Sequence, residues 1–518
     1  MPFAGAVRGA HVIALLKSLR NEVDHMAFDV EYDVVCIGGG GSGKSAAYTI
    51  ATESDLSVCV LEKLENCGGS SIYAEGTCAS ESSEQAARPH PDYPGELPEG
   101  AHFPTHEEHV QRYIDYSHHR ANVEVAKAFA YNSSETIDIY KGLGIEYTDV
   151  TIYAFDQPAE LYTFHRPEGL GQHCQDVLER ACVNAGVDIF TNTPAQELIT
   201  EDGKIVGVVA QDADGNEMRI GAKAVVLATG GFGNNMEMVE KYSWIPNIHK
   251  THYQSVPTQN TGDGVRMAEA VGAHLKDIGA LMIIGCTDGR TLGSGINGAG
   301  YQPNLWVDTK GKRFCNEAVA NSFADTGNTI AMRDDGIVFS VMDEDTVTRL
   351  ESGTGSAVGL GDFIPIHKTM PTLRAEIEEA LPDGAAFKAD TIEGLAEAMG
   401  VDVETFKAVV EKYNEACDAG KDDEFMKPAK FLQPVRKAPF YATKQRPSIL
   451  VSCGGIRING NFQVTDKDYV AIPGLYAVGM EATGLFGDTY NLDVPGTANG
   501  FAHTSGRLAA RHIISTLA

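Results

Sequence analysis

The stretch that decides the fold is "DVVCIGGGGSGKSAA", residues 33–47. Its apolar part, "VVCI", predicts a short buried parallel strand, and the segment after the glycines predicts a helix that begins with small residues. Between them, Gly38, Gly40 and Gly43 have the G-x-G-x-x-G spacing of a dinucleotide-binding turn. These glycines would permit a tight turn, backbone approach to a pyrophosphate and close helix packing, with the helix N-terminus facing the phosphates. A merely flexible glycine run is the alternative.

An acidic residue at the end of the next strand favours the dinucleotide interpretation. Residues 56–61 read as that strand, and Glu62 ends it, 19 residues after Gly43. A carboxylate there accepts hydrogen bonds from both ribose hydroxyls and repels a 2′-phosphate, which argues against NADP. The run also fits the P-loop pattern G-x-x-x-x-G-K-[ST], but that interpretation needs an additional aspartate and gives Glu62 no role. We therefore expect Lys44 on the outer face of the helix.

Composition limits the class of protein. The 518 residues are too many for one core, so two domains are expected, one of them discontinuous. The net charge of −30 disfavours partners such as nucleic acid or an anionic membrane. No apolar run reaches the length of a membrane span, and ten cysteines without a C-x-x-C pair fit a reducing cytoplasm. The first 25 residues read as an extension or as a mis-assigned start.

Further along the chain, glycine turns alternate with predicted strands and helices. "GGSS" at residues 68–71 is a second glycine turn whose hydroxyls can bond a phosphate or a flavin edge, and residues 106–143 read as helical. A strand at residues 475–478 precedes a polar loop and a closing helix. Residues 280–436 lack this alternation and instead mix predicted helices, such as 402–419, with loops. We interpret this range as an inserted cap.

Six motifs in order now resemble a known family. They are the glycine fingerprint, "EK" followed by "GGSS", "ATGGFG", "TGDG", "GKRFCNE" and "IPGLYAVGMEATG". Together they resemble the flavoprotein subunits of the fumarate reductase and succinate dehydrogenase superfamily, over almost all of the chain from about residue 30. The resemblance implies an α/β fold: an N-terminal extension (1–29), a discontinuous Rossmann-like FAD-binding domain (30–279 and 437–518) and an inserted α+β capping domain (280–436). Substrate would lie between the cap and the isoalloxazine ring.

The same resemblance assigns residues to FAD. In it the first glycine turn lines the pyrophosphate, Glu62 holds the ribose, and Asp263 helps hold the ribityl side. The full set that it implies is Gly38, Gly40, Gly41, Ser42, Gly43, Glu62, Lys63, Gly68, Gly69, Ser70, Ser71, Ala195, Thr229, Gly230, Asp263, Glu481, Thr497 and Ala498. Some members of the superfamily attach FAD to a histidine in the stretch that matches residues 68–77. That stretch has no histidine here, so we expect non-covalent FAD that mild denaturation releases.

The chain departs from the dicarboxylate enzymes of this superfamily. Where they have two histidines, "ILVSCGG" has Leu450 and Val451, and where they have a substrate-clamping arginine, "NLDVPGTA" has Asp493. The position of their catalytic arginine matches Val347, near Arg349. Since arginine forks are what a dicarboxylate needs, we expect neither fumarate nor succinate as substrate.

The C-terminal loop is more similar to ketosteroid dehydrogenases of the superfamily. These have a tyrosine after G-x-x, and "GDTY" places Tyr490 there. A phenol donates to a ketone oxygen, joined by a backbone N–H, which the resemblance assigns to Gly496. Their tyrosine base corresponds to Asn321 here. Tyr301, in a glycine-rich loop, is the substitute candidate for the acid or base.

The sequence therefore predicts an FAD-dependent oxidoreductase that reduces or forms a C=C bond next to a carbonyl, by hydride transfer at flavin N5. Its substrate would be a neutral, rather apolar enone or ketone, steroid-like or aromatic. The alternative is an unsaturated carboxylic acid such as a cinnamate, urocanate or fumarate, for which Arg349, Arg446 and Arg457 are the arginines to check; a non-catalytic electron carrier is a third interpretation. The electron partner would be a redox protein, reduced flavin or NADH.

No metal site is expected. Five histidines cluster between residues 102 and 119. Two of them, His118 and His119, are adjacent and would point to different helix faces, and no other ligand completes a recognisable set. The cluster reads as a solvated histidine-rich helix.

Overall fold

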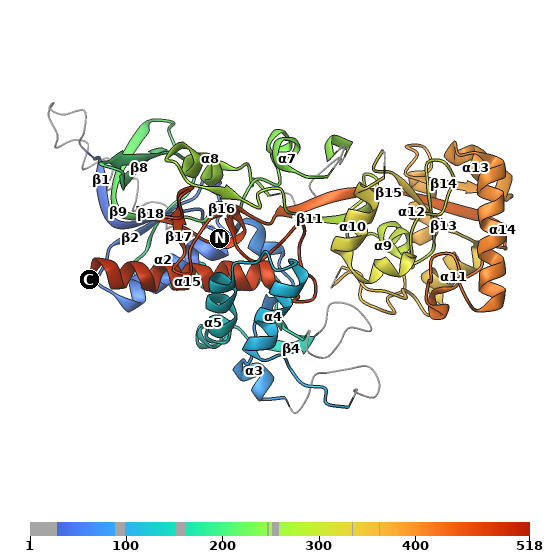
Figure 1. Cartoon of the computed structure of the whole chain (residues 1–518), viewed down its shortest axis with the longest axis horizontal. Helices are drawn as coiled ribbons and strands as arrows, with labels where there is room; N and C mark the ends of the chain where they lie inside the picture. The colour runs from blue at the N-terminus through green and yellow to red at the C-terminus, as the bar shows by residue number, and fades with distance from the viewer. Residues whose placement is uncertain are drawn as a thin grey trace.

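The computed structural model describes residues 28–88, 99–151, 162–245, 248–250, 258–333, 335–361 and 363–518. The predicted N-terminal extension, apart from its last two residues, lies outside this range. Figure 1 shows two parts that lie end to end along the long axis, one containing both the N-terminal strand and the C-terminal helix. The strands β11 (Leu281–Thr287) and β15 (Phe440–Ser452) run between the two parts.

The first part is built on an eight-stranded sheet. Its strand order is β17-β18-β9-β1-β2-β6, and β7 and β8 extend it beside β9. The central strand β1 (Val30–Ile37) pairs in parallel with β2 (Val58–Leu61) and with β9 (Glu217–Leu227). The other strands are β6 (Asp188–Phe190), β7 (Ala195–Glu201), β8 (Lys204–Gln211), β17 (Gln463–Thr465) and β18 (Ala471–Ala477). Val34, Val35 and Cys36 are fully buried, as the apolar run of a central parallel strand requires.

Two helices with small residues pack against each other beneath this sheet. They are α2 (Gly41–Glu53) and α15 (Thr497–Leu517), and they lie side by side in both views. The close approach depends on glycine: a Cβ on Gly506 of α15 would lie 2.2 Å from the Ser42 carbonyl oxygen of α2. This packing brings the N-terminal turns of both helices to the same region of the molecule.

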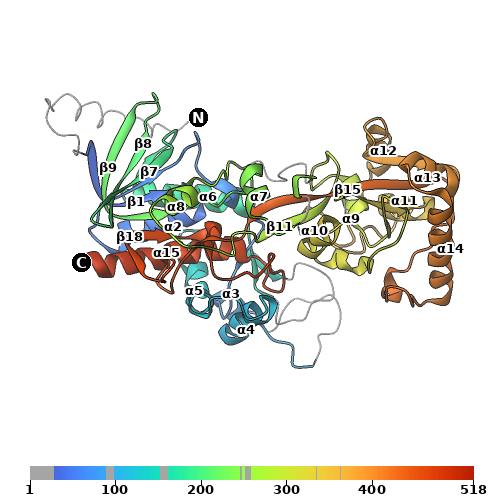
Figure 2. The ribbon, with the colours of Figure 1, turned by 45° about the horizontal axis from the view of Figure 1, so that its top comes forward.

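The second part has a sheet of its own. Strands β11, β15, β13 and β12 form an antiparallel array in that order, with β14 on β15. The remaining bounds are β12 (Leu305–Asp308), β13 (Val338–Met342), β14 (Ala386–Ala389), α9 (Gly295–Tyr301), α10 (Phe323–Ala331), α11 (Glu344–Ser352), α12 (Leu373–Ala380), α13 (Ile392–Met399) and α14 (Val403–Ala419). Helices surround this sheet in Figure 2. The expected end of the cap at 436 falls just before β15, which belongs to this sheet.

The remaining helices and short strands include elements that pack against α2, α15 and the first sheet. They are η1 (Gly69–Tyr73), α3 (Ser83–Ala86), α4 (His106–Tyr116), α5 (Val123–Gly142), α6 (Leu170–Asn184), α7 (Met236–Tyr242), α8 (Asp263–Ala270) and the short strands β3 (Thr77–Cys78), β4 (Tyr147–Thr151), β5 (Phe164–Pro167), β10 (Leu275–Lys276), β16 (Gly455–Arg457) and β19 (Ala482–Thr483). Within the described ranges, no helix is long and apolar enough to cross a membrane.

Candidate active site

One cavity extends from the glycine turn of the first part to the sheet of the second. Its first end is lined by Ile37, Gly38, Gly40, Gly41, Ser42, Leu61, Glu62, Lys63, Leu64, Gly69, Ser70, Ser71, Pro194, Ala195, Ala228, Thr229, Gly230, Gln259, Asn260 and Asp263. Its second end is lined by Met282, Ile284, Leu292, Phe323, Leu360, Phe363, Leu450 and Val451. Between them lie Tyr73, Ala74, Glu75, Gly76, Phe164, Met480, Tyr490, Leu492, Gly496, Ala498, Asn499 and Ala502.

The glycine turn has the geometry that the sequence predicts. Gly38 has φ +112°, and a Cβ there would lie 2.3 Å from the Ala228 carbonyl oxygen. A Cβ on Gly43 would lie 1.9 Å from the Gly38 carbonyl oxygen, so this glycine serves helix–strand packing and does not line the cavity. Gly40 caps α2 without a side-chain hydrogen bond. The first amides of α2 are therefore left to bind an anion in the cavity.

Glu62 is held in place by the backbone on both sides. Its Oε2 accepts a hydrogen bond from the Gly39 amide at 2.9 Å, and its Oε1 accepts one from the Leu64 amide at 2.9 Å. The side chain is buried, at the end of β2 and against the glycine turn. These hydrogen bonds hold the Glu62 carboxylate next to the glycine turn, at the position where the sequence predicts the ribose of the cofactor.

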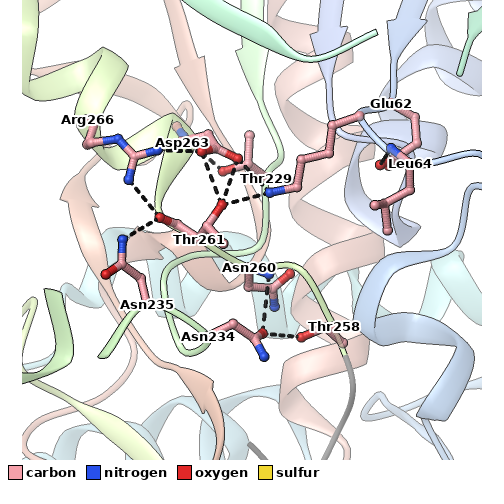
Figure 3. A network of polar contacts seen from close by, with 12 residues as sticks. Glu62, Leu64, Thr229, Asn234, Asn235, Thr258, Asn260, Thr261, Asp263 and Arg266 are labelled. Carbon is pink, nitrogen blue, oxygen red and sulfur yellow. Dashed lines mark hydrogen bonds and ion pairs between the residues drawn. The ribbon is translucent and has the colours of Figure 1, made fainter. Parts of the chain in front are cut away.

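A polar network continues from this end of the cavity (Figure 3). Lys63 Nζ donates to Asp263 Oδ2 at 2.7 Å and to Thr261 Oγ1 at 2.8 Å. Asn260 Nδ2 donates to Ser70 Oγ at 2.9 Å. These contacts connect the loop before α8 and the start of that helix with the end of β2 and with the second glycine turn. They also pair Lys63, the cation of the described lining, with a carboxylate.

Glu481 is not one of the residues that line the cavity, but it contacts Thr229, which does line it. Its carboxyl accepts hydrogen bonds from the amide of Thr229 and from Thr229 Oγ1, the latter at 2.6 Å. Burial raises the pKa of Glu481 to about 7. The residue thereby orients Thr229, which does line the cavity.

Tyr490 lies where the cavity passes from one part to the other. Its hydroxyl accepts a hydrogen bond from the Ala498 amide at 3.0 Å, in the first turn of α15. Its ring stacks on Phe486, with centroids 5.2 Å apart. Burial raises the pKa of the phenol above its ordinary value, so the hydroxyl stays protonated at neutral pH. Its hydrogen can donate to a ligand in the cavity.

The second end of the cavity is apolar. Met282 of β11 and Val451 of β15 are cross-strand partners, and both line it. Leu450 and Val451, which replace the histidines of the dicarboxylate enzymes, are therefore in the cavity wall. None of the described lining residues is arginine or histidine.

The arginines proposed for a carboxylate clamp are engaged elsewhere. Arg349 donates to the Gly355 carbonyl at 2.5 Å and Arg446 to Asp288 at 2.9 Å, while Arg457 lies over the Tyr469 ring. Asp493 also lies outside the described lining, and its pKa is raised, mainly by burial. None of the three arginines provides a positive charge to the cavity wall that the structure describes.

The structure places most of the predicted site residues together. Besides Gly43 and Glu481, three predicted residues lie outside the described lining: Gly68, Thr497 and Tyr301. The Thr497 hydroxyl donates to the Val494 carbonyl at 2.6 Å. Tyr301 ends α9 in the core, 2 % exposed. Tyr490 and Gly496, the other two catalytic candidates, do line the cavity.

Two expectations about basic residues were wrong. Lys44 is fully buried, because α6 packs over its face of α2, and its Nζ donates to the Gln175 carbonyl at 3.1 Å. His109 is also in the core, where burial lowers its pKa to about 3 and Ser80 Oγ lies 2.9 Å from its Nδ1. No group of three metal-binding side chains occurs among the described residues.

Sequence reasoning missed several polar lining residues, among them Asn260, Asn499 and Glu75. Asn260 directly precedes the "TGDG" motif, and Asn499 follows "PGTA", so proximity to a motif was the available signal. Glu75 has no such signal beyond its place in "GGSSIYAEGT". Asn499 Oδ1 is buried and has no hydrogen-bond partner in the described part of the chain.

These features fit FAD. The uncapped first turn of α2 suits a pyrophosphate, and the carboxylate of Glu62 suits a ribose. The orphaned Asn499 acceptor suits a donor on a bound ligand. When bound, FAD supplies hydride chemistry at N5.

Comparison with known proteins gives concordant results. The family model of the FAD binding domain matches residues 33–493. The vinyl phenol reductase of Lactiplantibacillus plantarum is 34% identical over 500 residues, which cover 93% of this chain and 96% of that protein. The NADH:acrylate oxidoreductase of Vibrio harveyi is 29% identical over 87% of this chain, which spans only 47% of that protein. The 3-ketosteroid Δ1-dehydrogenase of Sterolibacterium denitrificans has the same fold, with a TM-score of 0.74 at 21% identity, covering 94% of this chain and 100% of that one.

Proposed function

This chain belongs to the FAD binding domain family. From that premise we propose that it reduces the C=C bond of a neutral, largely apolar aromatic alkene. The double bond of this alkene is conjugated with a ketone or with the ring of a phenol. The chain is an FAD-dependent oxidoreductase that acts on carbon–carbon double bonds, in the superfamily of fumarate reductases and ketosteroid dehydrogenases. The fold class, FAD and the enzyme class predicted from the sequence are thus confirmed.

The observation that carries the substrate proposal is the apolar second end of the cavity. Eight apolar side chains line it, and the described lining contains neither arginine nor histidine. Lys63, at the other end, is paired with Asp263. A substrate carboxylate would enter a poorly hydrated space without a counter-ion, which is unfavourable by several kcal/mol. A neutral aromatic ring is favoured there because its burial removes apolar surface from water.

The similarity to a vinyl phenol reductase supports the same substrate class. That relative covers nearly the whole chain, and its name refers to a neutral aromatic alkene. A phenol and a ketone share one feature, an oxygen conjugated with the double bond. Either oxygen would accept or share a hydrogen bond with a protein hydroxyl.

Within this proposal, Tyr490 acts on the conjugated oxygen. Its phenol is protonated and fixed by the Ala498 amide. By donating to a substrate ketone oxygen it stabilises the negative charge that hydride transfer places on that oxygen. With a phenol as substrate, the same contact holds the substrate oxygen in place. The backbone of Gly496, whose φ is +83° at the N-cap of α15, lies in the same wall. The glycine turn and Glu62 hold the cofactor.

The test is anaerobic reoxidation of the reduced holoenzyme, followed by flavin absorbance. We expect rapid reoxidation by 4-vinylphenol or by an aromatic enone such as benzylideneacetone. We expect slow reoxidation by cinnamate, acrylate and fumarate. Preferred reoxidation by the carboxylates would overturn the proposal and support the unsaturated-acid alternative.

A further inference from the structure

We propose that Glu75 selects the substrate by accepting a hydrogen bond from a substrate hydroxyl. This inference rests on the proposed function and narrows the substrate to a phenolic alkene. Glu75 follows η1 and lines the cavity between its two ends, 8% exposed. Its Oε1 accepts a hydrogen bond from the amide of Phe363 at 3.2 Å. The carboxylate is therefore anchored where the loop before α12 meets the flavin-binding part.

The other carboxylates of the lining have different tasks. Glu62 accepts hydrogen bonds from the amides of Gly39 and Leu64. Asp263 forms ion pairs with Lys63 and Arg266. Both lie at the cofactor end of the cavity. Glu75 is instead beside Phe363, one of the apolar residues of the second end.

A carboxylate in this position separates substrates by their chemistry. Charge-assisted hydrogen bonds from a hydroxyl to a carboxylate are short and strong, and a poorly hydrated wall strengthens them. A phenol offers such a donor, whereas an ether and an ionised carboxylate do not.

Glu75 also complements Tyr490. The tyrosine offers a donor and the glutamate an acceptor, and both line the same cavity. A hydroxyl can accept from the first or donate to the second, whereas an ether or a ketone can only accept. The ratio of rates for a phenol and for its methyl ether therefore reports on Glu75.

The experiment compares wild type with Glu75→Gln, which keeps an oxygen for the Phe363 amide. Reduced holoenzymes are reoxidised anaerobically with 4-vinylphenol, 4-vinylanisole and 4-vinylbenzoate. In wild type we expect the phenol to react at least about tenfold faster than the ether. In Glu75→Gln that ratio falls to within about threefold. Because each ratio is taken within one protein, a general loss of activity cancels.

The matched control is Glu65→Gln, which removes the same charge from an exposed position near the second glycine turn. We expect this control to retain the wild-type ratios. A wild-type phenol-to-ether ratio near one overturns the inference, even if the variant does not fold. So does an unchanged ratio in Glu75→Gln. In both cases the proposed function stands, because neutral alkenes are still reduced. Reoxidation of wild type by acids alone instead removes the proposed function itself.

Discussion

The hydroxyl of Tyr490 accepts a hydrogen bond from the amide of Ala498, at 3.0 Å, in the first turn of α15. This contact fixes the tyrosine oxygen in the cavity wall and leaves its hydrogen to donate. The positive end of a helix also favours negative charge that develops nearby. The pair therefore forms a ready-made site for a conjugated oxygen.

The first prediction separates the two tyrosines that the sequence offers. Tyr490→Phe removes the donor, so we expect kcat to fall about 10²–10³-fold with FAD still bound. The unpaired Ala498 amide also destabilises the fold by about 1–3 kcal/mol. Tyr301→Phe, in the core outside the described lining, should keep kcat within about threefold. Steady-state rates with the enone benzylideneacetone decide between them, and equal losses would contradict the assignment.

The second prediction concerns Glu62. Its two oxygens each accept a backbone amide, from Gly39 and from Leu64. Glu62→Gln replaces one acceptor by a donor that faces an N–H group, so the glycine turn loses an anchor and the ribose a charged partner. We expect the Kd for FAD to rise about 10–100-fold, measured by fluorescence titration of the apoprotein. The exposed Glu65→Gln should bind FAD as wild type does.

The parts of this molecule that follow local rules could be predicted from the sequence. The strand–glycine–helix unit from Val34 to Gly43 is dictated by burial and by backbone space, and both are visible in the residue order. Glu62 was found because a strand end and an acid follow at a fixed distance. Leu450 and Val451, which the resemblance matches to histidines, lie in the apolar end of the cavity.

Features that depend on distant packing could not be predicted. Lys44 follows Gly43 by one residue, yet its burial is decided by α6, more than 120 residues later. His109 is enclosed through Ser80 and Tyr113, which no helix periodicity reveals. Glu75 gains its significance only when the loop at Phe363 approaches it.

The third prediction concerns pH and stability. Burial raises the pKa of Glu481 from 4.5 to about 7. The folded state therefore binds more protons than the unfolded state between these values, and stability falls as pH rises through them. The full effect is up to about 3 kcal/mol, present below pH 4.5 and lost above pH 7.

Glu481→Gln removes this titration. We expect the Tm advantage of wild type over the variant, measured on apoprotein, to shrink or reverse between pH 5 and pH 8. The variant also weakens the contacts of residue 481 with Thr229, but that loss is the same at every pH. It therefore does not affect the change of the Tm difference with pH. A Tm difference that is constant with pH would contradict the raised pKa.

The fourth prediction is that FAD is not covalently attached. Residues 68–77 contain no histidine, and the described cavity lining contains none either. Acid precipitation of the holoenzyme should leave all flavin absorbance in the supernatant. Flavin that stays with the precipitated chain would contradict the prediction, and mass spectrometry would locate its attachment.

The last prediction introduces a positive charge at the apolar end of the cavity. Leu450 lies on β15 in the wall, and the sequence resemblance matches it to a histidine of the dicarboxylate enzymes. In Leu450→His, an imidazole with an ordinary pKa near 6.5 becomes a counter-ion as pH falls. We expect the rate ratio of cinnamate to methyl cinnamate to rise about fivefold between pH 8 and pH 5.5, equivalent to roughly 1 kcal/mol. Wild type and Leu450→Asn, which is polar but uncharged, should show no such rise. If wild type already reacts faster with cinnamate at pH 8, the apolar wall does not determine the choice of substrate.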